Sequence, residues 1–161
     1  MPMSMLELER ALRGLRLSGM TATLEARALQ VASHEMDFLE ALSWLVQDEL
    51  DRRRTRLQER RYALSGLTER KSLSAMDWSY NPRLPKREIL ELGTLKFIDA
   101  RDDVLLLGQP GTGKSHVAKA LALMAVERGY KVLHRDALQL IEDITEAREL
   151  GALRRYREQL K

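Results

Sequence analysis

The chain has 161 residues, which is enough for one domain of ordinary size or for two small ones. It contains no cysteine, and this excludes a disulfide framework and a thiolate metal site. The formal net charge of +3 is a mild indication of a polyanionic partner, and the distribution of the charge matters more than its total.

The N-terminal sequence argues against secretion and membrane insertion. Residues 1–16 alternate charged residues with leucine and lack the continuous apolar core of a signal peptide. The most apolar stretch, residues 117–126, is interrupted by Lys119 and is too short to span a bilayer. We therefore expect a cytoplasmic protein without a membrane partner.

The first part of the chain, residues 1–66, is expected to be an all-helical domain that binds DNA or a partner. A capping box from Ser4 to Glu7 begins a short first helix, and a second helix is expected from about residue 18 to residue 33. Asp37 caps a third helix, which has no Gly or Pro before Gly66 and carries an apolar stripe over its first part.

The second part of the third helix is rich in arginine. These residues cover more than one helical face and exceed the acidic residues nearby, so they cannot all form intrahelical ion pairs. Two interpretations stay open, contact with the phosphates of DNA without sequence preference and a solvated helix with ion pairs of its own. The candidate nucleic-acid residues are Arg52, Arg53, Arg54, Arg56, Arg60 and Arg61.

Residues 67–85 show no sustained periodicity and contain Pro82 and Pro85, so we expect an extended linker and a domain boundary. The linker also carries Trp78 and Tyr80. Burial of these aromatic residues against the following domain is the favoured interpretation, ahead of contact with a nucleotide base.

The remaining residues, 86–161, alternate helical and strand-like patterns. Helical spacing covers residues 86–97, an apolar run at 104–107 predicts a buried strand, and residues 117–126 predict a helix packed on a sheet. A second short strand is expected at 131–134. Asp136 should cap a helix whose Leu138, Ile141 and Ile144 face inward, and a last helical segment covers 150–161.

The sequence between the first expected strand and its helix fits the phosphate-loop pattern G-x-x-x-x-G-K-[ST]. Glycines allow the backbone amides to approach a phosphate closely, and the helix N-terminus adds positive potential. Lys114 would reach the β- and γ-phosphates of ATP, and the Ser115 hydroxyl would bind Mg²⁺. The candidate cofactor-binding residues are Gly108, Gln109, Pro110, Gly111, Thr112, Gly113, Lys114, Ser115 and His116.

This loop resembles that of a known family, together with the arginine-rich helix, Met76-Asp-Trp-Ser79 and Arg16-Leu-Ser-Gly-Met20. The whole chain is similar to the IstB-type ATP-binding proteins, which are transposition helpers of insertion sequences, belong to the AAA+ class and are related to the helicase loader DnaC. The resemblance implies binding of ATP and Mg²⁺, homo-oligomeric assembly on DNA and a transposase as partner. It also implies an α/β fold, in which the helical domain precedes an incomplete P-loop NTPase (AAA+) α/β sandwich at residues 86–161.

The sequence departs from the family after Ser115. No apolar run ending in Asp-Glu, the Walker B pattern, follows Ser115, and the sensor residue and arginine finger are also missing. Members of the family are ATPases, but here no catalytic residue can be named, so enzymatic activity stays open. We expect a C-terminally truncated chain that is marginally stable because its strands lack partners.

The leading functional interpretation is an ATP-binding helper of transposition that assembles on DNA and recruits or regulates a transposase. Two alternatives remain. One is a replication protein of the helicase-loader type, and the other is a non-hydrolysing remnant that acts only as a binding module.

Overall fold

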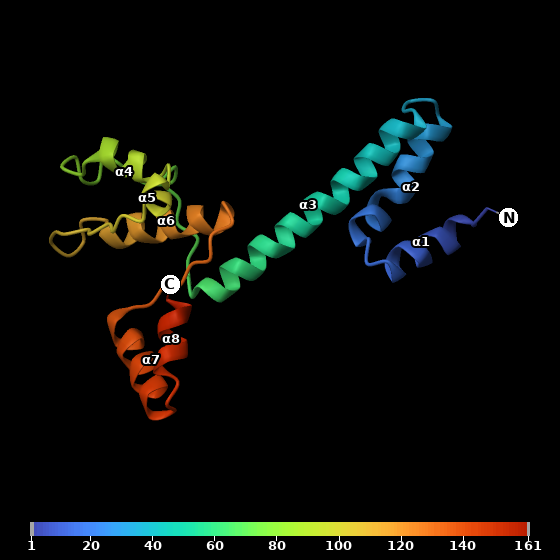
Figure 1. Ribbon diagram of the computed structural model, residues 1–161. Helices are drawn as coiled ribbons and strands as arrows, with labels where there is room; N and C mark the ends of the chain where they lie inside the picture. The colour runs from blue at the N-terminus through green and yellow to red at the C-terminus, as the bar shows by residue number, and fades with distance from the viewer. Residues whose placement is uncertain (1, 161) are drawn as a thin grey trace. The chain divides into compact units, whose positions relative to one another are not determined.

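The computed structural model describes residues 2–160 and divides the chain into two compact units, one up to Glu59 and the other from Arg60 on. Over the described residues the chain forms eight helices and no strand, and Figure 1 labels each helix. None of these helices combines the length and the apolar character that crossing a bilayer requires. The helices are α1 (Met5–Gly14), α2 (Ser18–Ala32), α3 (Phe38–Ser65), α4 (Lys86–Leu92), α5 (Lys96–Ala100), α6 (Lys114–Glu127), α7 (Ala137–Glu149) and α8 (Leu153–Gln159).

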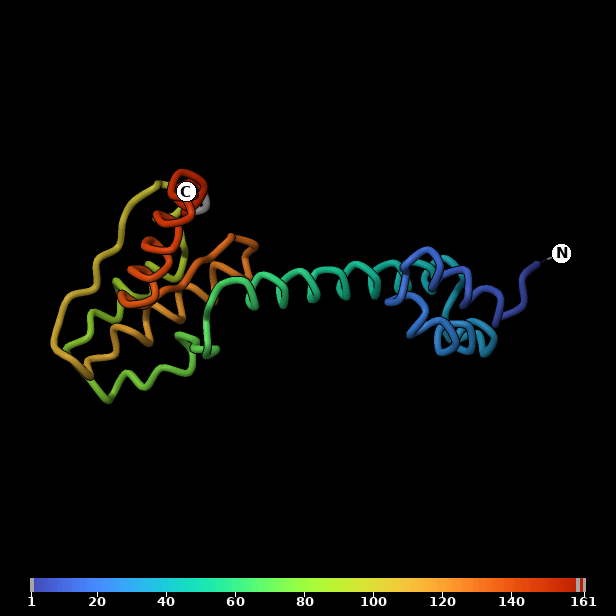
Figure 2. Tube along the Cα trace, turned by 90° about the horizontal axis from the view of Figure 1, so that it is seen from below, coloured from blue at the N-terminus to red at the C-terminus, as the bar shows by residue number. Residues whose placement is uncertain are grey.

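The first unit forms because short helices α1 and α2 pack beside the N-terminal part of α3 (Figure 2). The predicted capping box is confirmed, since the Ser4 hydroxyl accepts a hydrogen bond from the Glu7 amide and the Glu7 carboxylate accepts one from the Ser4 amide. Leu12, Leu24 and Leu45 form the small core of this unit.

Helix α3 begins where the sequence predicts, because the Asp37 carboxylate accepts a hydrogen bond of 2.7 Å from the Glu40 amide. Its apolar stripe is only partly covered. Leu45 is buried, whereas Phe38 remains 73% exposed and Leu50 55% exposed. The two short helices beside α3 thus provide too little apolar surface to bury its whole stripe.

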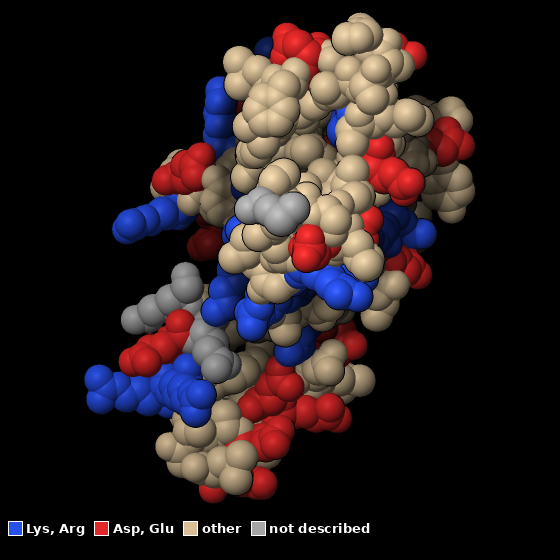
Figure 3. Space-filling view, turned by 90° about the vertical axis from the view of Figure 1, so that its right-hand side faces the viewer, with Lys and Arg blue, Asp and Glu red and all other residues tan. Residues whose placement is uncertain are grey.

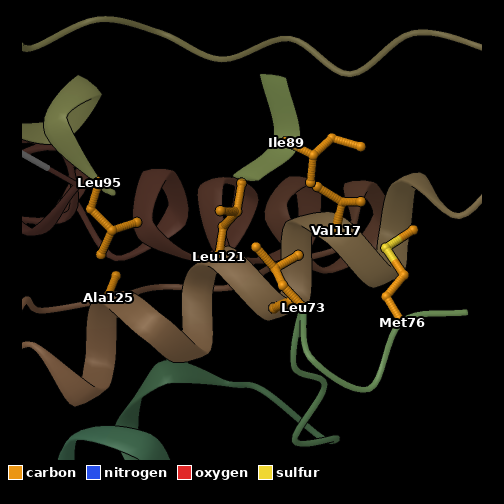
Figure 4. Packing of buried hydrophobic residues seen from close by; sticks show 8 residues of the cluster. Leu73, Met76, Ile89, Leu95, Val117, Leu121 and Ala125 are labelled. Atoms are coloured by element: carbon orange, nitrogen blue, oxygen red, sulfur yellow. The ribbon is translucent and has the colours of Figure 1, made fainter. Parts of the chain in front are cut away.

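The core of the second unit lies around α6, whose Val117 and Leu121 are buried (Figure 4). Leu73 and Met76 pack against them from residues 67–85, the segment expected as a linker. Ile89 of α4 completes this side of the core. Trp78 is packed against the same cluster and the Lys86 ammonium lies over its ring.

The helix expected over residues 86–97 is interrupted. Helix α4 ends at Leu92, and Leu95 adopts a left-handed backbone with a φ of 61° before α5 begins. Leu95 is also among the most deeply buried residues of the chain, at 1% exposure. A continuous right-handed helix has no place for a residue with a positive φ, so the helix is broken at the residue whose side chain is buried.

The expected α/β sandwich is wrong, because neither 104–107 nor 131–134 forms a strand in the part of the chain that the structure describes. In the first segment Leu106 packs against the core of the second unit, but Leu105 is 78% exposed and Leu107 82% exposed. In the second segment the His134 amide donates to the carbonyl of Ser65, at the end of a helix. A strand exists only where a neighbouring strand pairs with its amides and carbonyls, and these two segments do not pair.

Helices α7 and α8 form a hairpin at the end of the described chain. The predicted cap is confirmed, since Asp136 accepts a hydrogen bond from the Gln139 amide. The expected inward face of α7 is not observed. Leu138 is 75% exposed and Ile141 60% exposed, because no sheet covers them, and Ala147 is instead the buried residue of this helix.

Candidate functional site

The loop before α6 has the backbone that its glycines allow. The φ angles of Gly108, Gly111 and Gly113 are 151°, 78° and 93°. A residue with a Cβ atom is strained in this region, whereas glycine is not. The three glycines therefore let the chain turn sharply out of the extended segment and into α6.

Helix α6 begins at Lys114, as the phosphate-loop pattern predicts, with Gly113 as its N-cap. No side chain caps this end of the helix, so its first amides remain available to a ligand. Burial of Val117 and Ala120 in the core anchors the helix. Residues 110–116 line a hollow of about 460 Å³ at this end, where the helix dipole favours an anion.

Lys114 lies across the loop. Its ammonium donates a hydrogen bond of 2.6 Å to the carbonyl of Gln109 and one of 3.3 Å to the Thr112 hydroxyl. The Thr112 hydroxyl donates in turn to the same Gln109 carbonyl at 2.9 Å. The positive charge is thus held over the loop by neutral oxygens, which a phosphate oxygen could replace with a stronger, charge-assisted partner.

Ser115 is the second residue of α6, and it is exposed. Its hydroxyl is the kind of hard oxygen ligand that Mg²⁺ takes together with water and phosphate oxygens. Among the described residues, no group of three or more His, Asp or Glu side chains could hold a metal ion. The residues present therefore fit Mg²⁺ only as part of a complex with nucleotide phosphates, with Ser115 as the protein ligand.

His116 and three residues of the 67–85 segment meet at the loop. The His116 Nε2 atom lies 3.1 Å from the carbonyl of Ser72. A Cβ atom on Gly113 would lie 3.3 Å from the Met76 Cε atom, and the Asn81 side-chain amide donates to the carbonyl of Thr112 at 3.5 Å. Periodicity and motif spacing gave no signal for these contacts, because they join segments that are far apart in the sequence.

The structure separates the six arginines of α3 by their surroundings. Arg53 donates to the Glu49 carboxylate at 2.6 Å, and Arg52 donates to the carbonyl of Ser18 at 3.5 Å. Arg54, Arg56 and Arg60 are exposed, and Arg61 is partly buried. On the face that Figure 3 presents, basic and acidic side chains are interspersed.

Comparison with known proteins identifies the family. The profile of the IstB-like ATP binding protein family matches residues 10–161. This chain belongs to that family. The resemblance inferred from the sequence is therefore confirmed.

Three relatives show how far the similarity extends. A protein of Pseudomonas aeruginosa, named for ATP binding and for insertion sequence IS21, is 33% identical over 154 residues, which are 96% of this chain and 58% of the relative. One of Mycobacterium tuberculosis is 35% identical over 85% of this chain and 55% of its own length. One of Geobacillus stearothermophilus, named for insertion sequence IS5376, is 33% identical over 86% of this chain and 55% of its own length.

This IstB-like chain thus spans somewhat more than half of the length of these relatives. The names of all three join ATP binding to an insertion sequence. The loop at 108–116 lies inside the matched region.

Proposed function

We propose that this IstB-like chain binds ATP at residues 108–116 and serves as an ATP-binding helper in the transposition of an insertion sequence. The observation that carries the proposal is the arrangement at the start of α6. Three glycines with positive φ lead directly to the N-terminus of that helix, where no side chain caps the first amides. The ammonium of Lys114 lies over the same loop. Family membership supports the choice of ATP as the nucleotide.

The residues of the loop have distinct roles in this proposal. Backbone amides from Gly111 to Lys114 bind the phosphates, and the Lys114 ammonium exchanges the Gln109 carbonyl for phosphate oxygens. Ser115 supplies one ligand to Mg²⁺, which neutralises phosphate charge when bound. All the roles proposed for these residues are in binding.

The arginines of α3 provide the second part of the proposal. Arg54, Arg56 and Arg60 are exposed on this helix and can contact DNA phosphates without reading the bases. ATP binding would then accompany assembly on DNA, and a transposase would be the protein partner. The relatives' names support the link to insertion sequences.

The Lys114→Ala variant tests the nucleotide part by isothermal titration with ATP and Mg²⁺. Loss of the charge-assisted hydrogen bonds from one ammonium should weaken ATP binding roughly a hundredfold. Lys119→Ala is the matched control, because Lys119 lies on the same helix but pairs with Glu69 at 3.4 Å, and it should bind ATP as the wild type does. A folded wild-type chain that releases no heat with ATP would overturn the proposal and leave a binding module without nucleotide.

A further inference from the structure

Asn81 connects two parts of the second unit through one side chain. Its Oδ1 atom accepts a hydrogen bond of 3.2 Å from the amide of Arg83, and its Nδ2 atom donates to the carbonyl of Thr112 at 3.5 Å. The first partner can only donate and the second can only accept, so the two contacts together determine the orientation of the side-chain amide. Asn81 thus closes a local turn and holds the loop at the same time.

The direction of the Thr112 carbonyl determines the direction of the next amide in the loop. In a planar trans peptide the carbonyl of one residue and the amide of the next point in opposite directions. A carbonyl of Thr112 that is held toward Asn81 therefore turns the amide of Gly113 away from Asn81. Gly113 is the N-cap of α6 and lines the hollow at the start of that helix.

Apolar side chains of the same segment lie close to Gly113. A Cβ atom on Gly113 would lie 3.3 Å from the Met76 Cε atom and 3.7 Å from the Leu84 Cδ1 atom. Met76 is buried at 9% exposure and belongs to the core of the second unit. Met76, Trp78 and Leu84 thus attach this segment to the core, and Asn81 between them bonds to the Thr112 carbonyl.

We infer that Asn81 is a positioning residue of the nucleotide site, which holds the Thr112 carbonyl so that the Gly113 amide faces the bound phosphates. The inference rests on the proposed function, since it names a residue that prepares that same loop. If the plane of the Thr112–Gly113 peptide could turn freely, nucleotide binding would have to fix its orientation at a cost in entropy. The hydrogen bond from Asn81 fixes that orientation before the nucleotide binds.

Asn81→Asp is the most informative variant. It keeps the size of the side chain and the oxygen that accepts from Arg83, but it places a carboxylate oxygen against the Thr112 carbonyl in place of a donor. We expect ATP and ADP, each with Mg²⁺, to bind about tenfold more weakly, and Asn81→Ala to bind about threefold more weakly. Ser79→Ala is the matched control, because the Ser79 side chain bonds to Asp77 within the same segment, and its nucleotide affinity should equal that of the wild type.

The NMR signal of the Gly113 amide separates positioning from general stability. In the full chain, adding ADP should shift this amide strongly downfield in the wild type and in Ser79→Ala, and much less in Asn81→Asp. If Asn81→Asp does not fold, Asn81→Ala replaces it with the same direction of change. Equal affinity and equal Gly113 shifts in wild type and the folded Asn81 variant would overturn the inference. A wild type that binds no nucleotide would instead overturn the proposed function.

Discussion

Gly19 shows how one missing Cβ atom allows two helices to meet. An added Cβ would lie 2.6 Å from the Cα atom of Glu49 and 2.8 Å from the carbonyl oxygen of Asp48. At this distance the Gly19 amide donates a hydrogen bond of 2.6 Å to the buried Glu49 carboxylate. The carboxylate thereby serves as a cap for the start of α2, which has no side-chain cap of its own.

Gly19→Ala should destabilise the first unit by about 1–3 kcal/mol, because the clash is with backbone that cannot move without separating the helices. Urea unfolding followed by circular dichroism measures the effect. Gly14→Ala is the control, since its Cβ would meet nothing within 4 Å, and alanine in a helix should be neutral or slightly stabilising. Equal losses in both variants would contradict the close approach at Gly19.

The pKa of Glu49 determines how the same contact responds to acid. Burial raises this pKa, but the Arg53 guanidinium and the Gly19 amide together outweigh burial, so that the pKa lies below its ordinary value of 4.5. The carboxylate therefore stabilises the fold above about pH 4.5, and this contribution is lost as the pH falls through the lowered pKa. Glu49→Gln should be less stable than wild type at pH 7, and the difference should shrink toward pH 3 in urea unfolding series. A difference that is constant with pH would show that the charge of Glu49 does not contribute.

Among the elements, residues 104–107 and helix α6 differ most in how far their apolar side chains are buried. Both are apolar in sequence, but α6 forms the centre of a core while Leu105 and Leu107 are exposed to solvent. A helix satisfies its backbone hydrogen bonds internally and needs only one covered face. An extended segment must find a partner for every second amide, and residues 104–107 have none in the described structure.

This contrast predicts opposite effects of truncating two leucines. Leu105→Ala should change the free energy of unfolding by no more than about 0.5 kcal/mol, because its side chain is already exposed. Leu121→Ala should cost about 2–5 kcal/mol, since Leu121 is 7% exposed within the core. Thermal unfolding of both variants checks this, and a large loss for Leu105→Ala would indicate that the segment is buried in solution.

On the scale of the whole molecule, two separate elements carry the two parts of the proposed function. The exposed arginines of α3 would contact DNA, and the loop before α6 would bind the nucleotide. Affinity for DNA that comes from phosphate contacts should fall linearly on a logarithmic scale as salt is added. This property separates DNA contact from the alternative of a merely solvated helix.

Arg56→Gln should lower the slope of this salt dependence by about 1, because one phosphate contact is lost. Fluorescence anisotropy of the full chain with a labelled duplex, at a series of salt concentrations, measures the slope. Arg13→Gln is the control, since Arg13 is also exposed but pairs with Glu9 at 3.3 Å, and it should leave the slope unchanged. If the wild type does not bind DNA at low salt, α3 has no role of this kind.

Local patterns alone predicted most helix ends and the position of the loop. The caps at Ser4, Asp37 and Asp136 and the start of α6 at Lys114 depend on residues within one turn of each other. Such contacts form wherever the chain is helical, so the sequence contains all that they require.

Only the tertiary structure decided which apolar residues are buried, and the reason is that burial depends on a partner surface. Leu121 and Leu105 are equally apolar, but only Leu121 meets Leu73 and Ile89 from distant parts of the chain. For the same reason Asn81 could not be assigned to the loop in advance. The hydrogen bond from its side chain to Thr112 joins residues 31 positions apart, and whether such residues meet is decided by packing, not by spacing along the sequence.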